Sequence, residues 1–207
     1  MNKFPISPLF LPANKLEWIE KTFAKGTDSI ILDLEDSVPQ DQKSQAREAL
    51  HSHLHENNYC GNLIVRVNPI NDSVGQEDIR LLTDSNLGIS AYMLPKVEES
   101  GLISSLPDID IIALLETPIS IKNISEIASV DKVKGLALGG ADLSASLGST
   151  MDWDSLLYAR SKIVLEAAIN NLFSIDSPFM NIDNLDALQE ESLSLIHISE
   201  PTRPERI

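Results

Sequence analysis

Short apolar runs alternate with polar segments of helical period along most of the chain, and this alternation restricts the possible folds more than any other feature. The runs are Pro8–Pro12, Ser29–Leu34, Leu63–Asn68, Ala91–Pro95, Asp110–Leu115, Gly135–Gly139 and Leu172–Ile175. The helical candidates between them are Lys15–Ala24, Gln42–His55, Gln76–Thr83, Ser120–Ala128 and Ser155–Asn170. Because strands buried on both faces and joined by helices form a parallel sheet, the sequence predicts an α/β fold.

The number of apolar runs favours a (β/α)8 TIM barrel over a doubly wound sheet. Seven runs fit between residues 8 and 175, and no Gly-rich phosphate-binding fingerprint follows the first of them. The count stops one strand short of eight. The sequence therefore predicts a barrel that is incomplete at its C-terminus, with the last strand and helix missing.

The end of the chain departs from the alternation. Leu193–Arg203 reads LSLIHISEPTR, which matches the translation of a sequencing-library adapter at each of its eleven residues. Pro201 and Pro204 interrupt any further periodic pattern. We therefore expect a single barrel domain over residues 1–192, followed by a tail over residues 193–207 that is not native to the protein.

The charge balance restricts the partners. The chain has 31 acidic and 16 basic residues, a formal net charge of −15, which repels phosphate backbones, so no nucleic acid is expected as a partner. An anionic substrate would need a local positive charge or a metal ion. Cys60 is the single cysteine, and neither a signal peptide nor a stretch long enough to span a membrane can be read. These features predict a cytoplasmic protein without a membrane partner.

Two carboxylates follow consecutive runs at the end of the barrel where function gathers. Glu116 and Asp142 are expected to close the fifth and sixth strands, and Gly139 and Gly140 before Asp142 would let a ligand approach the backbone. Neighbouring strands lie roughly 5 Å apart, so the two carboxylates would repel each other unless a cation lay between them. Mg²⁺ prefers such oxygen ligands. The alternative, that both residues cap the following helices, fits the spacing equally well.

A guanidinium is expected at the same end of the barrel. Arg66 follows three apolar residues, so its charge needs an anionic partner. A substrate carboxylate bound by two hydrogen bonds is one candidate, and Glu35 or Asp36 on the neighbouring strand is the other. Glu35 and Asp36 are best explained as charges that favour the start of the next helix and support the site from behind.

Seven motifs occur in a fixed order between about Pro8 and about Asp186: LFLPAN, ILDLEDSVP, RVNP, LPKVE, ALLETP, GGADLSASLG and IDSPF. Together they resemble the citrate lyase beta-subunit-like family, which comprises CoA-ester lyases within the HpcH/HpaI aldolase superfamily. The resemblance implies a (β/α)8 barrel, usually a homo-oligomer, with Mg²⁺ at its mouth. It implies that Glu116 and Asp142 are metal ligands, that Arg66 binds the substrate carboxylate and that Glu116 also contacts substrate. Arg66, Glu116 and Asp142 would be the catalytic residues.

The resemblance also implies an activity. It predicts a Mg²⁺-dependent carbon–carbon lyase that cleaves a CoA thioester of a hydroxy acid, of the citryl-CoA or malyl-CoA type, to an acyl-CoA and an oxo acid. The superfamily's aldolases for free hydroxy acids carry a histidine directly after the glutamate of the second motif, and Asp36 at that place favours the CoA-ester branch. The alternatives are a thioester hydrolase of the malyl-CoA type on the same scaffold, or an inactive fragment, because the KLCIHP-like strand typical of the family is missing.

Overall fold

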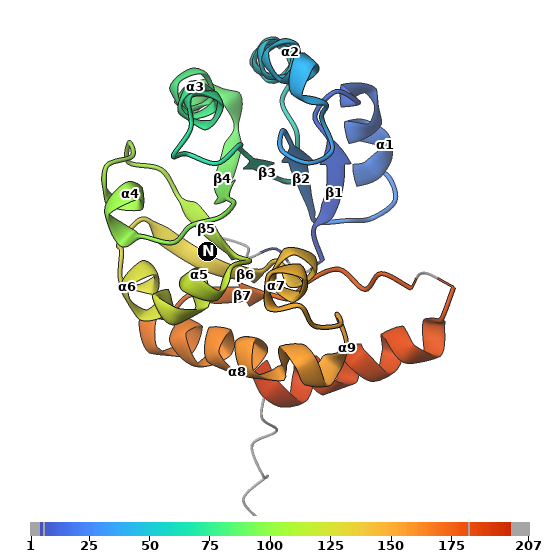
Figure 1. Ribbon diagram of the computed structural model, residues 1–207. Helices are drawn as coiled ribbons and strands as arrows, with labels where there is room; N and C mark the ends of the chain where they lie inside the picture. The colour runs from blue at the N-terminus through green and yellow to red at the C-terminus, as the bar shows by residue number, and fades with distance from the viewer. Residues whose placement is uncertain (1–4, 6, 182, 200–207) are drawn as a thin grey trace, which may run out of the picture.

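The protein forms one curled sheet of parallel strands surrounded by helices (Figure 1). The computed structural model describes residues 5, 7–181 and 183–199. The strands are β1 (Leu9–Pro12), β2 (Ser29–Asp33), β3 (Asn62–Arg66), β4 (Ile89–Leu94), β5 (Ile111–Leu115), β6 (Val133–Leu138) and β7 (Phe173–Ile175). Each predicted run overlaps one of them, although β3, β4 and β6 begin one or two residues earlier than predicted, and the strands pair in chain order from β1 to β7. The prediction of an α/β fold is confirmed.

The row of strands is open at both ends within the described part of the chain. β1 pairs with β2 alone, and β7 pairs with β6 alone. The arrangement is a curled half-barrel, consistent with an incomplete TIM-barrel-like fold.

The helices agree with the predicted segments in most places. They are α1 (Ile19–Phe23), α2 (Lys43–Glu56), α3 (Ser73–Leu82), α4 (Ser100–Ser104), α5 (Pro118–Lys122), α6 (Ile124–Ala128), α7 (Gly140–Leu147), α8 (Trp153–Asn170) and α9 (Leu185–Ser199). Helix α3 starts earlier than predicted because the Asp72 carboxylate accepts the N–H groups of Val74 and Gly75. Helices α4, α7 and α9 were not predicted. Among the described residues, no helix combines the length and apolar character needed to cross a bilayer.

The predicted helix Ser120–Ala128 is wrong as a single element. Asn123 separates α5 from α6, and its side-chain amide donates a hydrogen bond of 2.9 Å to the Glu98 carbonyl oxygen. Helix α5 also begins before Ser120, because Thr117 forms a capping box with Ser120 and Pro118 occupies the first turn. The tertiary hydrogen bond of Asn123 is not visible in the periodicity.

The apolar core has two layers, one on each face of the sheet. The larger layer lies between the sheet and the outer helices. The smaller layer fills the inside of the half-barrel with residues from every strand except β1: Ile31, Ile64, Ala91, Met93, Ile112, Leu114 and Ala137, with Phe173 and Ile175 against them. Because alternate residues of a strand face the same side, Asp33 and Arg66 lie on this inner face, one pleat beyond Ile31 and Ile64. The inner layer thus forms the floor below the polar carboxyl ends of the strands.

Candidate active site

The mouth of the half-barrel is the end at which the carboxyl ends of the strands meet. An ion pair between β2 and β3 forms one side of it. The parallel register places Asp33 beside Arg66. The Arg66 Nε and Nη2 groups donate hydrogen bonds of 2.7 Å to Asp33 Oδ1 and Oδ2. Burial alone would raise the pKa of Asp33, but the hydrogen bonds and charge of Arg66 outweigh it and lower that pKa below its usual value. The bidentate partner of Arg66 is therefore Asp33, which the sequence analysis did not consider for this role.

Glu35 and Asp36 both approach the remaining end of the same guanidinium. Arg66 Nη1 lies 3.2 Å from Glu35 Oε2 and 3.3 Å from Asp36 Oδ2. The Glu35 side chain is 4% exposed, whereas that of Asp36 is 62% exposed. Burial raises the pKa of Glu35, and the cations Lys96 and Arg66 offset this only in part. Glu35 is thus a buried partner of Arg66, and Asp36 is an exposed one.

A buried polar network supports this side from below. Lys43 on α2 donates to the Glu35 carbonyl oxygen at 2.9 Å and hydrogen-bonds the Asn68 side chain. Asp78 on α3 accepts from the Asn68 backbone N–H at 2.8 Å and from Arg47 Nε at 2.6 Å. Since each buried polar group here has a partner, the network fixes the loops after β2 and β3. The sequence predicted support at this place but not Asn68 or Asp78.

Glu116 lies on the opposite side of the mouth, directly after β5. Its side chain is buried, and Glu116 Oε1 accepts the Lys96 backbone N–H at 2.8 Å. Burial, the charge of Glu35 and the charge of Asp142 raise the pKa of Glu116 to about 7, although the Lys96 N–H partly offsets them. Two other carboxylates, those of Glu35 and Asp142, thus act on Glu116, and the sequence predicted the one of Asp142.

Asp142 does not close a strand, and that part of the prediction is wrong. β6 ends at Leu138, and Asp142 lies in the first turn of α7, where its side chain is exposed. It remains near enough to act on the charge of Glu116. A carboxylate in the first turn favours the helix N-terminus through its charge, but the N-cap residue is Gly139 and α7 has no side-chain capping hydrogen bond.

The two glycines before Asp142 make room for neighbouring side chains. A Cβ atom on Gly139 would lie 2.4 Å from the Glu116 Cβ, and one on Gly140 would lie 2.7 Å from the Ser177 Oγ. The close approach predicted for a ligand is therefore made by the protein's own Glu116 and Ser177. Ser177 Oγ is buried and has no hydrogen-bond partner among the described residues.

The strand-seven end has a structural role. Asp176 pairs with Arg160 of α8 at 3.0 Å, and Arg160 Nη2 reaches Glu191 of α9 at 2.6 Å. The Arg160 guanidinium also lies 4.6 Å from the ring centre of Trp153. These contacts attach α8 and α9 to the end of the sheet.

A metal ion fits the acidic side of the mouth. Glu116 offers buried oxygen, Asp142 offers exposed oxygen, and their like charges favour a cation between them. Within the described part of the chain, no group of three or more His, Cys, Asp or Glu side chains is arranged to hold a metal. An ion here would therefore complete its shell with water or substrate oxygens, as Mg²⁺ usually does.

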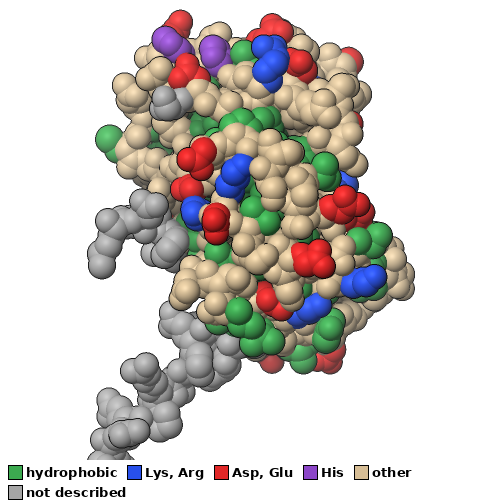
Figure 2. Space-filling model, turned by 90° about the vertical axis from the view of Figure 1, so that its left-hand side faces the viewer, with side chains coloured by type: hydrophobic (Ala, Val, Ile, Leu, Met, Phe, Trp, Pro, Cys, Tyr) green, Lys and Arg blue, Asp and Glu red, His purple; other side chains and the backbone are tan. Residues whose placement is uncertain are grey.

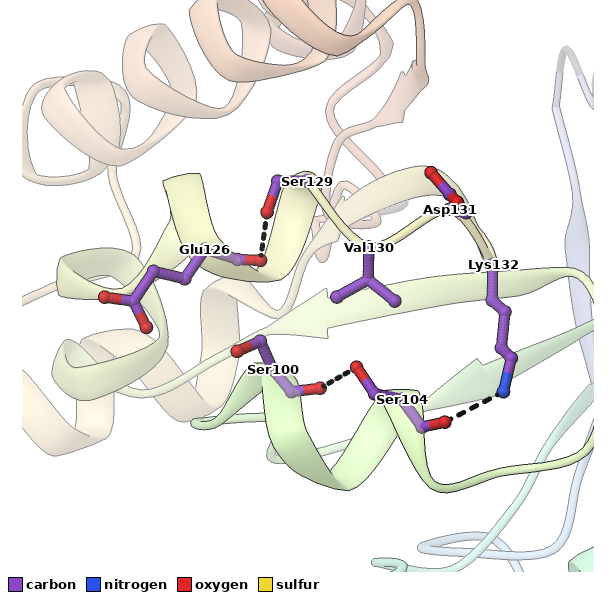
Figure 3. Close-up of a pocket in the computed structure, with 7 residues that line it drawn as sticks. All are labelled: Ser100, Ser104, Glu126, Ser129, Val130, Asp131 and Lys132. Carbon is purple, nitrogen blue, oxygen red and sulfur yellow. Dashed lines mark hydrogen bonds between the residues drawn. The ribbon is translucent and has the colours of Figure 1, made fainter.

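An open hollow of about 510 Å³ lies elsewhere, on the outer layer between α4 and α6 (Figure 3). Three of the polar side chains that line it are hydrogen-bonded to nearby backbone. The Ser104 hydroxyl donates to the Ser100 carbonyl, the Ser129 hydroxyl to the Glu126 carbonyl, and the Lys132 ammonium to the Ser104 carbonyl. The hollow thus has few free donors for a ligand.

Figure 2 shows acidic and basic side chains intermixed on one face of the molecule, so the negative charge forms no single patch there.

The sequence matches the HpcH/HpaI aldolase/citrate lyase family over residues 7–199. The chain belongs to this family. It is 29% identical to a (3S)-malyl-CoA thioesterase of Cereibacter sphaeroides, over 89% of this chain and 67% of the relative. It is 32% identical to a citrate lyase subunit beta-like protein of Mycobacterium tuberculosis, over 89% of this chain and 68% of the relative. The chain thus spans about two-thirds of the length of these relatives, and the predicted family is confirmed.

A solved structure agrees with this membership. A citrate lyase beta subunit from M. tuberculosis, complexed with oxaloacetate and magnesium, superposes with a TM-score of 0.82 at 30% identity. The alignment covers 93% of this chain and 86% of that one. The family contains enzymes named for lyase reactions on CoA esters, such as the mitochondrial citramalyl-CoA lyase of Rattus norvegicus.

Proposed function

We propose that this chain carries the site of a Mg²⁺-dependent carbon–carbon lyase that cleaves a CoA thioester of a hydroxy acid to an acyl-CoA and an oxo acid. The observation that carries the proposal is that two carboxylates and a guanidinium lie at the same end of the half-barrel. Buried Glu116 lies near enough to exposed Asp142 for the charge of Asp142 to raise its pKa, and Arg66 ends β3 at the same carboxyl end of the sheet. An oxo acid has the two features that these groups would bind, a carboxylate and a neighbouring oxygen.

Glu116 and Asp142 would hold the magnesium ion. Bound there, the ion would supply a positive charge that polarises a substrate oxygen and favours enolate formation. Glu116 is held in place by the Lys96 N–H and by packing against Gly139, so its oxygens need little rearrangement when substrate arrives.

Arg66 would bind the substrate carboxylate through the guanidinium edge that faces the mouth. Asp33 already takes the Nε and Nη2 groups, so a substrate carboxylate would compete for Nη1 with the exposed Asp36. Asp33 then acts as a positioning residue, because it fixes the plane of the guanidinium. Phe10 contributes to the same end, with the Arg66 guanidinium 5.1 Å from its ring centre.

A thioester hydrolase of the malyl-CoA type is the second candidate. It is favoured by one specific finding, the similarity to a protein named (3S)-malyl-CoA thioesterase. The two reactions share an activated acyl group and differ in the bond that breaks. In the lyase the carbon–carbon bond breaks and its electron pair goes to the thioester side, whereas in the hydrolase water attacks the acyl carbon and the thiolate leaves.

One assay separates the candidates. Malyl-CoA is incubated with the protein and Mg²⁺, and both free thiol and 2-oxo acid are measured. The lyase releases oxo acid without free thiol, and the hydrolase releases free thiol without oxo acid. Glu116→Gln serves as the matched inactive control. The assay is run on this chain and on a version completed with the C-terminal segment of a relative; if neither version yields either product, both candidate activities are wrong.

We also propose that an eighth strand closes the barrel between β7 and β1 in the full-length protein, which we expect to be a homo-oligomer. The support is the pair of open sheet edges, since an unpaired edge leaves backbone groups without partners. In this proposal the native part of this sequence ends near Ser192 and residues 193–207 are a foreign tail. Helix α9 and the family match both continue to residue 199, so part of the tail would extend a native helix. The completed version should then have a higher Tm than the present chain.

A further inference from the structure

Lys96, in the loop after β4, joins two carboxylates that come from distant strands. Its backbone N–H donates to Glu116 Oε1 at 2.8 Å, and its ammonium group donates to Glu35 Oε1 at 2.9 Å. Glu35 follows β2 and Glu116 follows β5. One residue thus connects both sides of the mouth.

The backbone of Lys96 is in a conformation that disfavours a lysine. Its φ angle is +52°, in the left-handed region where glycine and asparagine are the residues with the lowest strain. The hydrogen bond to Glu116 uses the backbone alone, so glycine would serve it equally well. The contact with Glu116 therefore does not explain why the residue is a lysine. Backbone outliers of this kind gather at ligand sites.

The ammonium group is the accessible cation of this mouth. The Lys96 side chain is 45% exposed, compared with 11% for Arg66, whose guanidinium is already surrounded by Asp33, Glu35 and Asp36. Glu35, by contrast, is 4% exposed and cannot follow Lys96 toward solvent. Glu35 Oε2 lacks a well-formed hydrogen bond and is held only by the 3.2 Å ion pair with Arg66. An anion that enters the mouth meets Lys96 before it meets Arg66.

We propose that Lys96 is a second anion-binding residue of this site, whose ammonium group leaves Glu35 and binds a carboxylate of the substrate. This inference rests on the proposed function, because it assumes that the mouth receives an oxo acid or hydroxy acid. Glu35 is then the resting partner of Lys96. The left-handed backbone keeps the side chain at the rim while its N–H holds Glu116.

The test is the binding of pyruvate, a small 2-oxo acid, by calorimetric titration at saturating Mg²⁺. Lys96→Met and Lys96→Gly should each weaken binding about tenfold or more, because a charge-assisted hydrogen bond is lost. Lys96→Arg keeps the charge and should stay within about threefold. Both variants lose the ion pair with Glu35, but Lys96→Gly also relieves the strained backbone, so its Tm should be higher than that of Lys96→Met. Equal loss of binding at different Tm values separates lost binding from lost folding.

The Glu35→Gln variant is expected to change the affinity for pyruvate in the opposite direction. Removing the resting partner should tighten pyruvate binding several-fold, and the double variant with Lys96→Met should lose that gain because the gain acts through Lys96. Lys134→Met is the control for net charge: this lysine is exposed and bonded to the Asp131 carbonyl oxygen, on the N-terminal half of β6. It should bind as the wild type does.

The outcomes distinguish the two proposals. If the wild type binds no pyruvate with Mg²⁺, the proposed function fails and the role of Lys96 fails with it. If the wild type binds pyruvate and Lys96→Met binds it equally well, the role of Lys96 alone is refuted. The same holds if Glu35→Gln weakens binding as much as Lys96→Met does, because both residues would then be merely structural.

Discussion

Buried Asp33 and Asp78 on the β2–β3 side of the mouth each face a guanidinium, whereas buried Glu116 on the β5–β6 side faces other carboxylates. The pKa of Asp33 is lowered and that of Glu116 is raised, although both are deeply buried. The difference lies in the neighbouring charge, since desolvation acts in the same direction on both.

We interpret this contrast as a difference between charged groups that stabilise the fold and charged groups that would bind a ligand. A buried carboxylate with an arginine partner is already compensated, so a cation would gain little from it. A buried carboxylate beside like charges carries an unfavourable energy that a cation would remove. The contacts of Asp33 and Asp78 therefore hold Arg66 and its neighbouring loops in place, and we propose the β5–β6 side as the cation site.

The largest expected effect is the loss of a compensated charge. Asp78→Ala removes the partner of both Arg47 and Asn68, which leaves a guanidinium buried without a carboxylate. We expect the free energy of unfolding to fall by about 3–5 kcal/mol. Urea unfolding measures it, with the exposed Asp108→Asn as the matched control. A loss below about 1 kcal/mol would mean that this side is not a stabilised frame.

The second effect is the pH dependence of the uncompensated charge. Between pH 4.5 and about 7 the folded protein keeps a proton on Glu116 that the unfolded chain releases. The folded state then binds more protons, so stability falls as the pH rises through this window. Glu116→Gln lacks this loss. Without metal, the stability of the wild type relative to Glu116→Gln should drop by up to about 3 kcal/mol between about pH 5 and pH 8. A constant difference across these pH values would contradict the raised pKa.

A third prediction concerns Arg66. Arg66→Lys keeps the charge but loses the planar set of donors that binds Asp33 at two atoms. We expect kcat/KM for a carboxylate-bearing thioester to fall by about tenfold or more, equivalent to about 1.5–3 kcal/mol. Steady-state kinetics on the completed protein measure it. If the lysine variant turns over substrate as fast as the wild type, Arg66 has a structural role and does not bind the substrate carboxylate.

The smallest effect is expected from the end of the chain. Ending the protein at Ser192 keeps the Arg160–Glu191 ion pair and removes the tail that we consider foreign. The free energy of unfolding should change by no more than about 0.5 kcal/mol. If thermal unfolding shows a large loss instead, residues 193–207 are a genuine part of the fold.

The strands, and the positions of Glu116 and Arg66 at strand ends, were predictable because apolar runs end abruptly in polar residues. Glu116 and Arg66 lie directly after or at such ends, where one residue of sequence fixes the position in space. Asp142 was misplaced because Gly139 and Gly140 already leave the strand and start a helix. The pairing of Asp33 with Arg66 could have been inferred from the alternation of strand faces.

Other features could not be inferred from periodicity. The role of Lys96 depends on a positive φ angle and on two contacts far apart in sequence. Asp78 lies on the buried face of α3, where a charged residue normally argues against burial. Such residues are recognised only when their tertiary partners are known.

The most direct test of the cation site is calorimetric titration with Mg²⁺ at about pH 8, where Glu116 is ionised. The wild type should bind, and Glu116→Ala and Asp142→Ala should each lose most of that binding, since Mg²⁺ dehydrates reluctantly and gains little from one carboxylate. Asp36→Ala, which removes an exposed carboxylate from the Arg66 side, should leave the affinity close to that of the wild type. Unchanged Mg²⁺ affinity in both the Glu116 and Asp142 variants would contradict the account.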